Sequence, residues 1–372
     1  MKRILVYGLS NKWGGVESIV HSIITQIEND VNIDVLLSGE DIDIRHTRHN
    51  ENVSIISITS WGESRRKFKD ELRDVLEKKD YDYVWINASL MCNRDIINVI
   101  RKNSSAQIIT HSHGSYFEES NKLKEIILLA LHYLNRSLYR KSVKYKCMCS
   151  EKSGKWFYGN AIFRNEHPYL IKNGIDINKY LFNKEIRNKI RTQLEIYNSD
   201  EIVLFHAGRL TPVKNQSFLI DLVKEAISQN LKVRLLIAGS GELEEELKHK
   251  VTEAHLETRI QFLGNRNDIN ELYQAADIFL LPSYHEGFPV TLTEAQAAGL
   301  KCIVSSTISR ETNITGNVKY LSISNYSLQM WIDEIKTTEL SGEYRLERSL
   351  VVRTKRYDIS DVATDLKIYL GI

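Results

Sequence analysis

Short apolar runs alternate with longer amphipathic segments along the first half of the chain. RILVYGL, NIDVLLS and YDYVWINA are nearly continuous apolar runs, whereas GGVESIVHSIITQIE and SRRKFKDELRDVLEKK repeat apolar positions with the period of a helix. Strands buried on both faces have such runs, and their alternation with helices is typical of a parallel sheet. We therefore predict a doubly wound α/β domain over residues 1–165.

The second half repeats this scheme. The runs EIVLFHAG, VRLLIAG, RIQFLG, DIFLLPS and KCIVSS are predicted strands, with helical patterns such as NQSFLIDLVKEAISQ and ELEEELKHKVTEA between them. A length of 372 residues also favours two domains over one. We predict a second α/β domain over residues 166–355, a terminal helix, and a central cleft that binds ligands beyond the carboxyl ends of the strands.

Composition narrows the class of protein. Hydrophobic residues make up 42% and charged residues 26% of the chain, as in soluble globular proteins. No apolar run reaches the ~18 residues of a membrane span, and the N-terminal apolar run is too short for a signal peptide. The four cysteines lack the spacing of metal ligands. A cytoplasmic protein with reduced thiols and no metal site is expected.

The charge is divided unevenly between the halves. Residues 1–165 carry 25 Lys and Arg against 20 Asp and Glu, whereas residues 166–372 carry 25 against 28. A nucleic-acid-binding domain would show a much stronger basic excess. We therefore expect no nucleic-acid partner.

The stretch HAGRLTPVKNQ places two cations between a predicted strand and a helix start. Arg209 can hold two phosphate oxygens in a fork, and Lys214 supplies a mobile point charge. Unpaired N–H groups at a helix start favour an anion, so the loop is a candidate phosphate site. Two solvated loop cations are the alternative interpretation. Asn215 is predicted to cap the helix that follows.

The stretch AGSGELEEEL resembles part of a dinucleotide fingerprint. Gly239 and Gly241 would let the backbone approach a ligand closely, but Glu244 takes the place of the third glycine. The segment GLSNKWGG after the first strand does not fit the fingerprint either. A nicotinamide-dependent enzyme is therefore disfavoured.

The stretch PSYHEGFPVTLTEAQAAG carries two carboxylates at the end of a predicted strand. Gly287 frees the backbone to turn, and Pro289 suits the first position of a helix. Glu294 can accept hydrogen bonds from a diol such as a ribose, and Glu286 approaches the same ligand from before the helix. The alternative is a capping glutamate and a solvated one. The helix-start N–H groups predicted to face the ligand belong to Val290, Thr291 and Leu292.

Five motifs together resemble one enzyme family. EGFPVTLTE resembles the EX7E motif of retaining GT-B glycosyltransferases of family 4, and GRLTPVKN resembles their diphosphate-binding loop. KNGID, GGVE and DINELYQAADIFLLPS are similar to further motifs of that family, in the same order. The resemblance covers the whole chain and is especially close to bacterial capsule and exopolysaccharide transferases. It implies a GT-B fold of two Rossmann-like domains, with helix 356–372 packed back on the first.

The resemblance assigns roles to particular residues. It implies that Glu286 contacts the donor sugar, that Glu294 binds the ribose, and that Arg209 and Lys214 neutralise the leaving diphosphate without a metal or other cofactor. A histidine near the anomeric centre is also implied. His113 in HSHG is the preferred candidate, and His111 is the alternative, packed behind it. Further donor contacts are implied for Gly14, Gly15, Gly239, Gly264, Asn265, Arg266, Gly287, Phe288, Pro289, Val290 and Thr291.

The reaction implied is transfer from a nucleotide sugar with retention of configuration. The donor expected is a UDP-linked hexose or N-acetylhexosamine, and the acceptor is a saccharide or lipid-linked saccharide of a cell-surface polysaccharide. Domain closure would bring Gly14, Gly15 and His113 over the donor. The donor sugar, the acceptor, the linkage and the oligomeric state stay open.

The predicted helix at 121–144 combines apolar positions with six cations and one carboxylate, Glu125. A basic amphipathic helix can lie on anionic lipid, so peripheral contact with the inner face of the cell membrane is expected. A core-covering helix with a cationic rim is the alternative. The cations are Lys122, Lys124, Arg136, Arg140, Lys141 and Lys144.

Three rival interpretations remain. The DID sequence at 41–43 mimics a metal-binding motif of GT-A transferases, but a solvated acidic turn is favoured there. A hydrolysing sugar-nucleotide epimerase would share the two-domain fold and need no acceptor. A non-catalytic sugar-nucleotide sensor would bind the donor without transferring or hydrolysing it.

Overall fold

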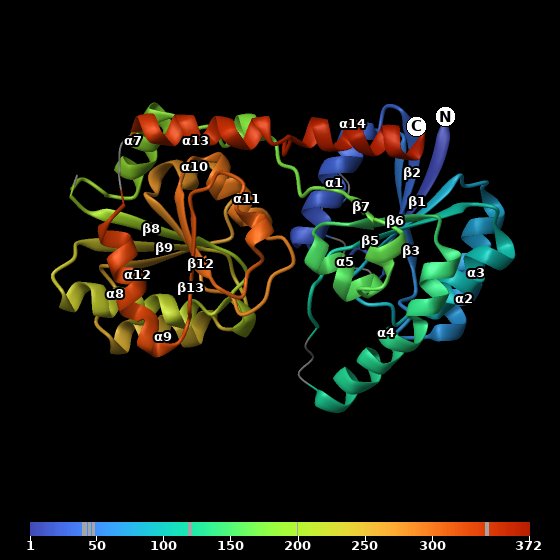
Figure 1. The fold of residues 1–372 in the computed structure, drawn as a ribbon, viewed down its shortest axis with the longest axis horizontal. Helices are drawn as coiled ribbons and strands as arrows, with labels where there is room; N and C mark the ends of the chain where they lie inside the picture. Colours follow the sequence, from blue (N-terminus) through green and yellow to red (C-terminus); the bar gives the residue numbers. More distant parts are fainter. Residues whose placement is uncertain (39–42, 44–45, 47–48, 118–120, 199, 339–341) are drawn as a thin grey trace. The chain divides into compact units, whose positions relative to one another are not determined.

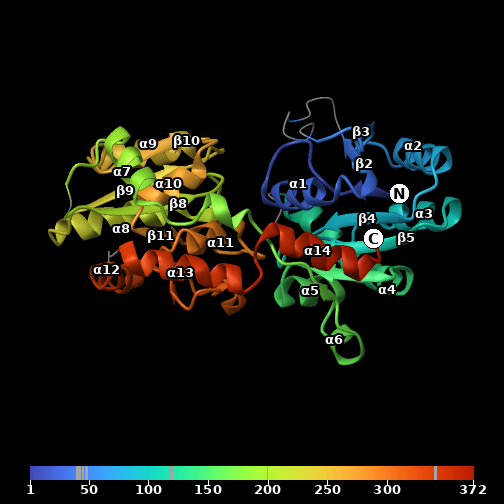
Figure 2. The same ribbon diagram turned by 90° about the horizontal axis from the view of Figure 1, so that it is seen from above.

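The chain forms two compact units. A computed structural model describes residues 1–38, 43, 46, 49–117, 121–198, 200–338 and 342–372 (Figure 1). Residues 1–174 and 359–372 form unit 1, and residues 175–358 form unit 2. Each unit is a parallel sheet with helices on both faces, as Figure 2 also shows.

Unit 1 contains a seven-stranded parallel sheet in the order β3-β2-β1-β4-β5-β6-β7. The chain first adds strands on one side of β1 and then continues on the other side from β4. This reversal leaves a topological switch point between β1 and β4. The strands are β1 Lys2–Tyr7, β2 Val31–Ser38, β3 Val53–Ile58, β4 Tyr83–Ala88, β5 Gln107–Ser112, β6 Tyr145–Met148 and β7 Tyr169–Leu170.

Helices cover this sheet and form its core with it. Leucine and isoleucine side chains of α2 and α3 pack on the strands, together with the fully buried rings of Phe68 and Phe157. The helices are α1 Gly15–Ile27, α2 Arg65–Lys78, α3 Arg94–Asn103, α4 Lys122–Ser142, α5 Glu151–Tyr158, α6 Ile162–Asn165 and α14 Ile359–Leu370.

Both ends of the chain belong to unit 1. Helix α14 packs on α1, and Tyr83 donates a 2.5 Å hydrogen bond to the carbonyl of Leu370. Lys367 pairs with Asp30 at 2.9 Å. The unit extends to Gly174, beyond the expected boundary at residue 165, because β7 pairs with β6 and adds a strand to the sheet.

Unit 2 contains a six-stranded parallel sheet in the order β10-β9-β8-β11-β12-β13, with its switch point between β8 and β11. Its core gathers aliphatic side chains around Trp331 and Phe218, whose ring centroids lie 5.1 Å apart. The strands are β8 Ile202–Ala207, β9 Val233–Ala238, β10 Ile260–Gly264, β11 Ile278–Leu281, β12 Lys301–Ser305 and β13 Val318–Leu321.

The helices of unit 2 include several that the apolar pattern did not predict. Helices α7 and α13 are the main additions, and α5 is a similar addition in unit 1. The helices are η2 Ile177–Lys179, α7 Lys184–Gln193, η3 Pro212–Lys214, α8 Gln216–Ser228, α9 Glu244–Glu253, α10 Ile269–Ala275, α11 Val290–Ala297, η4 Arg310–Thr312, η5 Asn325–Ser327, α12 Leu328–Lys336 and α13 Gly342–Thr354.

Candidate functional site

The loops that follow β8 and β11 are tied together at the switch point of unit 2. The side-chain amide of Asn215 donates to the carbonyl of Pro282 at 3.3 Å, and the N–H of Tyr284 donates to the carbonyl of Val213 at 2.9 Å. Ligands of doubly wound sheets bind at this position, outside the carboxyl ends of the strands. The two stretches that the sequence singled out for a nucleotide sugar therefore lie side by side.

Lys214 and Glu286 form an ion pair across these loops. The ammonium lies 2.6 Å from a carboxylate oxygen, and the two side chains are 22% and 12% exposed. The predicted diphosphate cation and the predicted sugar-binding carboxylate are thus direct partners. The pair is largely shielded from water, which strengthens its Coulomb attraction. An incoming diphosphate would compete with Glu286 for Lys214.

Arg209 follows β8 at the same edge of the sheet. Its side chain is exposed, and no ion pair to it occurs in the part of the chain that the structure describes. Its carbonyl accepts a 2.9 Å hydrogen bond from Gln216, which fixes the backbone of the loop. Arg209 and Lys214 thus belong to the same loop after β8, and both side chains are candidates to bind one anion.

His206 lies beneath this pair, and the sequence analysis did not single it out. Its Nδ1 donates to the carbonyl of Leu280 on β11 at 2.9 Å, and its Nε2 accepts from the amide of Gln216 at 3.1 Å. Burial lowers the pKa of His206 to about 4, with a further lowering by Lys214 and an opposing effect of Glu286. The ring is therefore neutral and braces β8, β11 and α8. The sequence feature that could have indicated His206 is a polar residue inside the apolar run LFHA, just before the strand ends.

Glu294 is held by two tyrosines. Tyr180 donates to one carboxylate oxygen and Tyr273 donates to the other, both at 2.8 Å. Burial raises the pKa of Glu294, although the two hydroxyls favour its charged form and oppose this shift. Each oxygen keeps a lone pair, so the carboxylate can still accept a hydrogen bond from a diol. Sequence reasoning identified Glu294 but neither tyrosine.

The start of α11 differs from the expectation in two ways. Pro289 is the N-cap, with extended backbone, and the helix begins at Val290 rather than at the proline. The N–H of Leu292 donates to the carbonyl of Pro289 at 3.1 Å, so it does not face a ligand as predicted. No side chain caps the helix. Val290 and Thr291 therefore remain the candidate N–H donors.

Asn215 was expected to cap α8 and does not. Its side chain makes no capping hydrogen bond, because its backbone is left-handed, with φ 55°, and its amide reaches Pro282 instead. Asparagine tolerates this conformation better than most residues. Asn215 thus links two loops rather than ending a helix.

Gly239 and Gly241 serve backbone packing. A Cβ on Gly239, whose φ is +127°, would lie 2.1 Å from the carbonyl oxygen of Gly208. A Cβ on Gly241 would lie 2.2 Å from that of Leu210. Both glycines let the loop after β9 touch the loop after β8. Loop packing is thus one structural reason for these glycines, and the donor contact of Gly239 stays a prediction.

The predicted base-framing stretch follows β10. The carbonyl of Gly264 accepts from Gly239 at 2.8 Å, and Asn265 donates to Ser240 at 2.8 Å. Arg266 makes a bidentate pair with Asp268 at 2.8 and 2.6 Å. Asn265 and Arg266 are exposed at the same edge of the sheet.

Phe288 is a predicted donor contact whose side chain is buried. Its ring stacks on Tyr357 with a centroid distance of 5.9 Å. Three buried polar atoms of the segments that follow β8 and β11 have no hydrogen bond among the described residues: Ser283 Oγ, Thr291 Oγ1 and Gln216 Oε1. Buried polar atoms are nearly always satisfied, so these three favour a polar ligand or water there. Phe288 can contribute its backbone.

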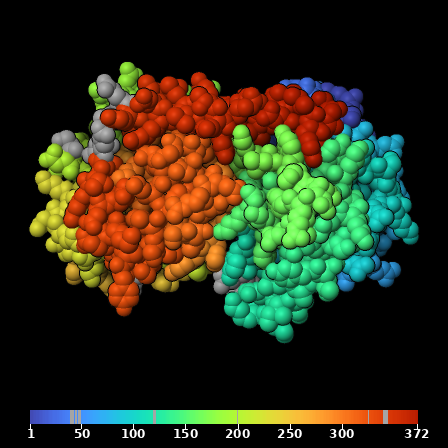
Figure 3. All heavy atoms as spheres, viewed as in Figure 1, coloured from blue at the N-terminus to red at the C-terminus, as the bar shows by residue number. Residues whose placement is uncertain are grey.

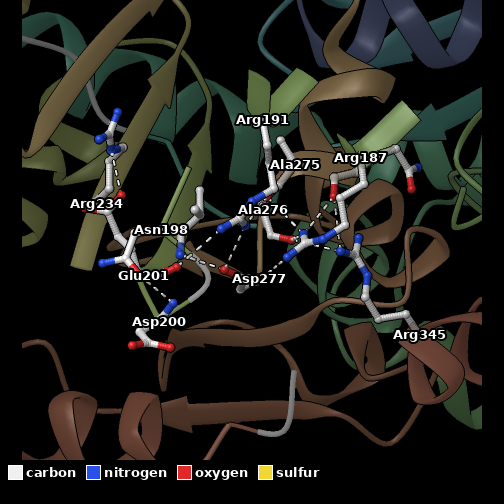
Figure 4. Close-up of polar contacts among 12 residues, drawn as sticks. Arg187, Arg191, Asn198, Asp200, Glu201, Arg234, Ala275, Ala276, Asp277 and Arg345 are labelled. Carbon is white, nitrogen blue, oxygen red and sulfur yellow. Dashed lines mark hydrogen bonds and ion pairs between the residues drawn. The ribbon is translucent and has the colours of Figure 1, made fainter. Parts of the chain in front are cut away.

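A buried arginine network supports the helices that carry Glu294 and Tyr273 (Figure 4). Arg345 on α13 donates to the carbonyls of Tyr273 at 3.0 Å, Ala276 at 2.8 Å and Ala298 at 3.0 Å. These carbonyls lie at the C-terminal ends of α10 and α11, which favour a cation. Burial lowers the pKa of Arg345 to about 9, and Arg187 beside it acts in the same direction. Arg187 itself pairs with Asp277 at 2.6 Å.

In unit 1, both candidate histidines lie at the end of β5. His113 directly follows the strand, and its Nε2 donates to the amide oxygen of Asn87 at 2.9 Å. Burial lowers its pKa to about 3, so the ring is neutral. His111 is fully buried, and neither of its ring nitrogens has a hydrogen-bond partner among the described residues. Their ring centroids lie 4.0 Å apart, so the two rings share one side of the sheet.

The two glycines at the start of α1, Gly14 and Gly15, are also in unit 1. Gly14 is the N-cap of α1 in extended conformation, without a side-chain cap. A Cβ on Gly15 would meet nothing within 4 Å, so packing does not require this glycine. Glu17 accepts a 2.7 Å hydrogen bond from the N–H of Ser10 and closes the preceding loop.

Metal ligands and membrane-spanning helices were also considered in the sequence, and the described residues bear on both. In the part of the chain that the structure describes, no three His, Cys, Asp or Glu side chains are placed to hold a metal ion. None of the described helices is long and apolar enough to cross a bilayer. Residues 41 and 42 of the DID sequence lie outside the described residues.

Most of the second unit is similar to a known protein family. Residues 186–349 match the family model for glycosyl transferases group 1. This segment, which is less than half of the chain, resembles that family. An Escherichia coli protein named UDP-Gal:alpha-D-GlcNAc-diphosphoundecaprenol alpha-1,3-galactosyltransferase is 30% identical over 254 residues, which is 66% of this chain and 61% of that protein. The chain thus spans less than two thirds of that relative.

Solved structures show the fold of the whole chain. Anabaena HepE, crystallised with UDP and glucose, is 19% identical with a TM-score of 0.79 over 100% of both chains. The lipopolysaccharide glycosyltransferase WaaG is 14% identical with a TM-score of 0.69 over 99% of both chains. The chain therefore has the GT-B type of fold, built from two doubly wound parallel α/β units.

Proposed function

We propose that the protein is a retaining, metal-independent glycosyltransferase that uses a UDP-sugar. The observation that carries this proposal is the pairing of Lys214 with Glu286 at the switch point of unit 2, in a segment that matches the group 1 glycosyl transferase model. Arg209 lies on the same loop as Lys214. Transfer creates a diphosphate leaving group, whose charge two cations can stabilise in place of a divalent ion. Fixed donors that need no rearrangement during the reaction are the most effective.

The proposed donor contacts follow the order of groups in a nucleotide sugar. Glu286 and Lys214 contact the sugar and the diphosphate, the N–H groups of Val290 and Thr291 contact the diphosphate, and Glu294 accepts from the ribose. In unit 2, Gly287, Pro289, Gly264, Asn265 and Arg266 remain further proposed contacts. From unit 1, Gly14, Gly15 and His113 are proposed to act on the sugar during transfer.

His113 would act as a neutral group. Because its pKa is lowered to about 3, it carries no charge near neutral pH and cannot stabilise the diphosphate as a cation. Its Nδ1 is the ring nitrogen not used by Asn87, so it can accept a hydrogen bond from a sugar hydroxyl. Positioning of the sugar is the role proposed for it.

The acceptor proposed is a saccharide or lipid-linked saccharide of a surface polysaccharide. The name of the Escherichia coli relative specifies a UDP-galactose donor and a diphosphoundecaprenol-linked acceptor, and the HepE crystals contain UDP and glucose. These names support a UDP-hexose donor and leave the choice of hexose to experiment.

A donor panel tests this proposal. The purified chain is incubated with UDP-glucose, UDP-galactose, UDP-N-acetylglucosamine or GDP-mannose, and thermal shift and nucleotide release are measured with and without a lipid-linked saccharide. We expect a UDP-sugar to raise the Tm and to release UDP faster with the acceptor. Conversion of the donor to its epimer without acceptor would favour an epimerase. Binding of a donor without any turnover would favour a sensor.

A further inference from the structure

Four buried polar side chains lie on one side of the sheet of unit 1, at the ends of β4 and β5. Trp85 and Asn87 are two positions apart on β4 and therefore point to the same side. Asn87 is the register partner of His111 on β5, and the ring centroids of His111 and His113 lie 4.0 Å apart. Trp85 and Asn87 are each 2% exposed, His111 is fully buried, and His113 is 8% exposed. Polar groups this deep usually serve a purpose other than packing.

Other elements of unit 1 cover this side of the sheet. Tyr83 shares it, and its hydroxyl donates to the carbonyl of Leu370 on α14 at 2.5 Å. Helix α14 packs on α1, and Figure 3 shows the C-terminal residues, in red, at the surface of the unit. The four polar side chains are therefore shielded from bulk water. In such surroundings, a hydrogen-bond donor or acceptor without a partner destabilises the fold.

Most polar atoms of this group have no partner among the described residues. These atoms are Trp85 Nε1, Asn87 Nδ2 and both ring nitrogens of His111. One hydrogen bond does form within the group, and it joins Nε2 of His113 to Oδ1 of Asn87 at 2.9 Å. Asn87 thus leaves its N–H donors unpaired and uses its oxygen for His113. A leucine of similar shape would bury no unpaired donor, so packing does not explain an asparagine here.

The backbone around Asn87 is fixed at the switch point between β1 and β4. A Cβ on Gly8, whose φ is +95°, would lie 1.9 Å from the carbonyl oxygen of Asn87, so the end of β1 touches β4 there. The N–H of His113 donates to the carbonyl of Ala88 at 3.2 Å. Both side chains of the hydrogen bond are therefore attached to strand ends that contact each other. Such support holds the amide and the ring in one relative orientation.

The Asn87 oxygen decides which nitrogen of His113 carries the proton. An amide oxygen can only accept, so Nε2 must be the protonated nitrogen of the neutral ring. Nδ1 then keeps its lone pair and can accept a hydrogen bond. In the other tautomer, Nδ1 would carry the proton and could only donate. The contact with Asn87 therefore selects the form of the ring to which a sugar hydroxyl can donate.

We propose that Asn87 is a positioning residue for sugar transfer, which keeps the proton of His113 on Nε2 and presents Nδ1 as an acceptor to a hydroxyl of the donor sugar. Asn87 is almost fully buried, so it acts through the ring and does not touch the sugar. The inference rests on the proposed function, because His113 contacts the sugar only in that role. The state of the ring can nevertheless be measured without any sugar.

NMR of protein labelled with ¹⁵N in the histidine rings tests the contact directly. The signal of His113 is assigned by its loss in His113→Gln, and no nucleotide sugar is added. At pH 7 we expect a neutral ring with its proton on Nε2, because the pKa of His113 is lowered to about 3 by burial. In Asn87→Leu a substantial part of the rings should carry the proton on Nδ1. A wild-type ring protonated on Nδ1, or an unchanged pattern in Asn87→Leu, overturns the inference.

Kinetics test whether the contact matters for transfer. Asn87→Leu should raise the KM for the donor roughly five- to tenfold, which corresponds to the loss of one hydrogen bond to the sugar, and should change kcat less. Asn87→Asp is the conservative variant, since its carboxylate accepts from Nε2 as the amide oxygen does. At pH 8 its donor KM should stay within about twofold of the wild type. Equal losses in both variants would leave Asn87 a structural role only and overturn the inference.

Asn87→Asp should also alter the titration of the ring. A negative charge beside Nε2 favours the imidazolium, so the pKa of His113 should rise from about 3 to about 5. The titratable neighbour His111 stays neutral, since burial lowers its pKa. Below the raised pKa, Nδ1 is protonated and cannot accept, so the donor KM should rise between pH 8 and pH 5 about twofold more than in the wild type. An unmoved titration of His113 would contradict the contact.

Asn135→Leu is the matched control. Asn135 is also buried in unit 1, but its amide donates to the carbonyls of Met91 at 2.8 Å and Cys92 at 3.1 Å. This substitution should lower the Tm more than Asn87→Leu does and leave the proton of His113 on Nε2. Movement of that proton in the control as well would overturn the assignment to Asn87. If the NMR results are as expected but no donor is turned over, the proposed function fails, whereas a normal donor KM in Asn87→Leu overturns only the inference.

Discussion

Glu286 and Glu294 lie eight positions apart in one segment and are held by different chemistry. Glu286 lies before α11 and pairs with the mobile ammonium of Lys214 at 2.6 Å. Glu294 lies within α11 and accepts from two tyrosine hydroxyls at 2.8 Å each. A lysine ammonium on its long stem can turn from one anion to another, whereas two tyrosine hydroxyls hold a carboxylate in one place. The first arrangement suits a group that must respond to chemistry, and the second suits one that positions a ligand.

The two surroundings also differ in their structural support. The Glu286 side depends on loops, joined by Asn215 and braced by His206. The Glu294 side depends on helices α10 and α11, whose C-terminal carbonyls are held by the buried Arg345. Substitutions on the first side should therefore change turnover, and those on the second side should change donor binding.

Lys214→Ala should have the largest effect. Loss of a cation at the leaving diphosphate is expected to lower kcat roughly 10²–10³-fold, because its interaction strengthens as charge develops in the transition state. The assay is UDP release in the presence of acceptor, with the Tm measured in parallel. Lys224→Ala on α8 is the control, an exposed lysine of the same unit that should leave kcat unchanged. Near-normal turnover of Lys214→Ala would remove the basis of the proposed function.

His206→Asn should change how stability depends on pH. The pKa of His206 is lowered to about 4 in the folded chain, so its contribution to stability is complete above the unfolded value of about 6.5 and is lost as the pH falls towards 4. Between pH 7 and pH 5 this histidine should cost the wild type about 2 kcal/mol. Asparagine can still donate to Leu280 but does not titrate.

The measurement is the free energy of unfolding in urea at both pH values. The wild type should lose about 2 kcal/mol more than His206→Asn over this interval. His249→Asn, which removes a histidine that is 73% exposed on α9, should keep the wild-type dependence. If His206→Asn lost as much stability between pH 7 and pH 5 as the wild type does, His206 would not contribute to the pH dependence.

The sheets were predictable because their strands are buried on both faces. Runs such as those of β8 and β11 contain almost only apolar residues, so their pattern indicates a parallel sheet. Helix α7 contains only two apolar residues, Ile186 and Ile190, and buries only the second, so it offers too few apolar positions to be recognised. Helix α13 buries Arg345 and Ser349, so polar residues occupy the face where apolar ones are expected. A buried arginine can be predicted only if the carbonyls that accept its hydrogen bonds are known, and the sequence does not show them.

The part of the site that could be predicted follows from the rule that ligands of doubly wound sheets bind beyond the carboxyl ends of the strands. That rule selects the loops after β8 and β11, and hence Lys214 and Glu286. It does not reveal which groups pair, because Tyr180 lies 114 positions from Glu294 and approaches it only through the fold. The left-handed conformation of Asn215 could not be predicted either. Asparagine is favoured both at helix N-caps and in left-handed backbone, so its presence before a helix does not distinguish the two.

Tyr273→Phe should raise the KM for the donor roughly tenfold and change kcat little, because it frees one oxygen of a positioning carboxylate. The lost hydroxyl favoured the charged form, so the pKa of Glu294 should rise and the acid limb of the donor KM profile should move to higher pH. Tyr320→Phe, whose hydroxyl bonds Thr312 in the same unit, is the control. A fall in kcat at unchanged KM and an unmoved profile would assign Glu294 to catalysis instead.

Two substitutions at Asn215 should differ from each other by the smallest amount, about 1 kcal/mol of stability. Alanine loses the hydrogen bond to Pro282 and must adopt φ 55°, which together should cost about 2 kcal/mol of stability. Glycine loses the same hydrogen bond but adopts that φ freely, so about 1 kcal/mol is expected. Urea unfolding of both variants measures the difference of about 1 kcal/mol, which is the cost of the left-handed backbone. Equal stability of the two would mean that the hydrogen bond to Pro282, rather than the backbone conformation, is what makes asparagine suitable between the two loops.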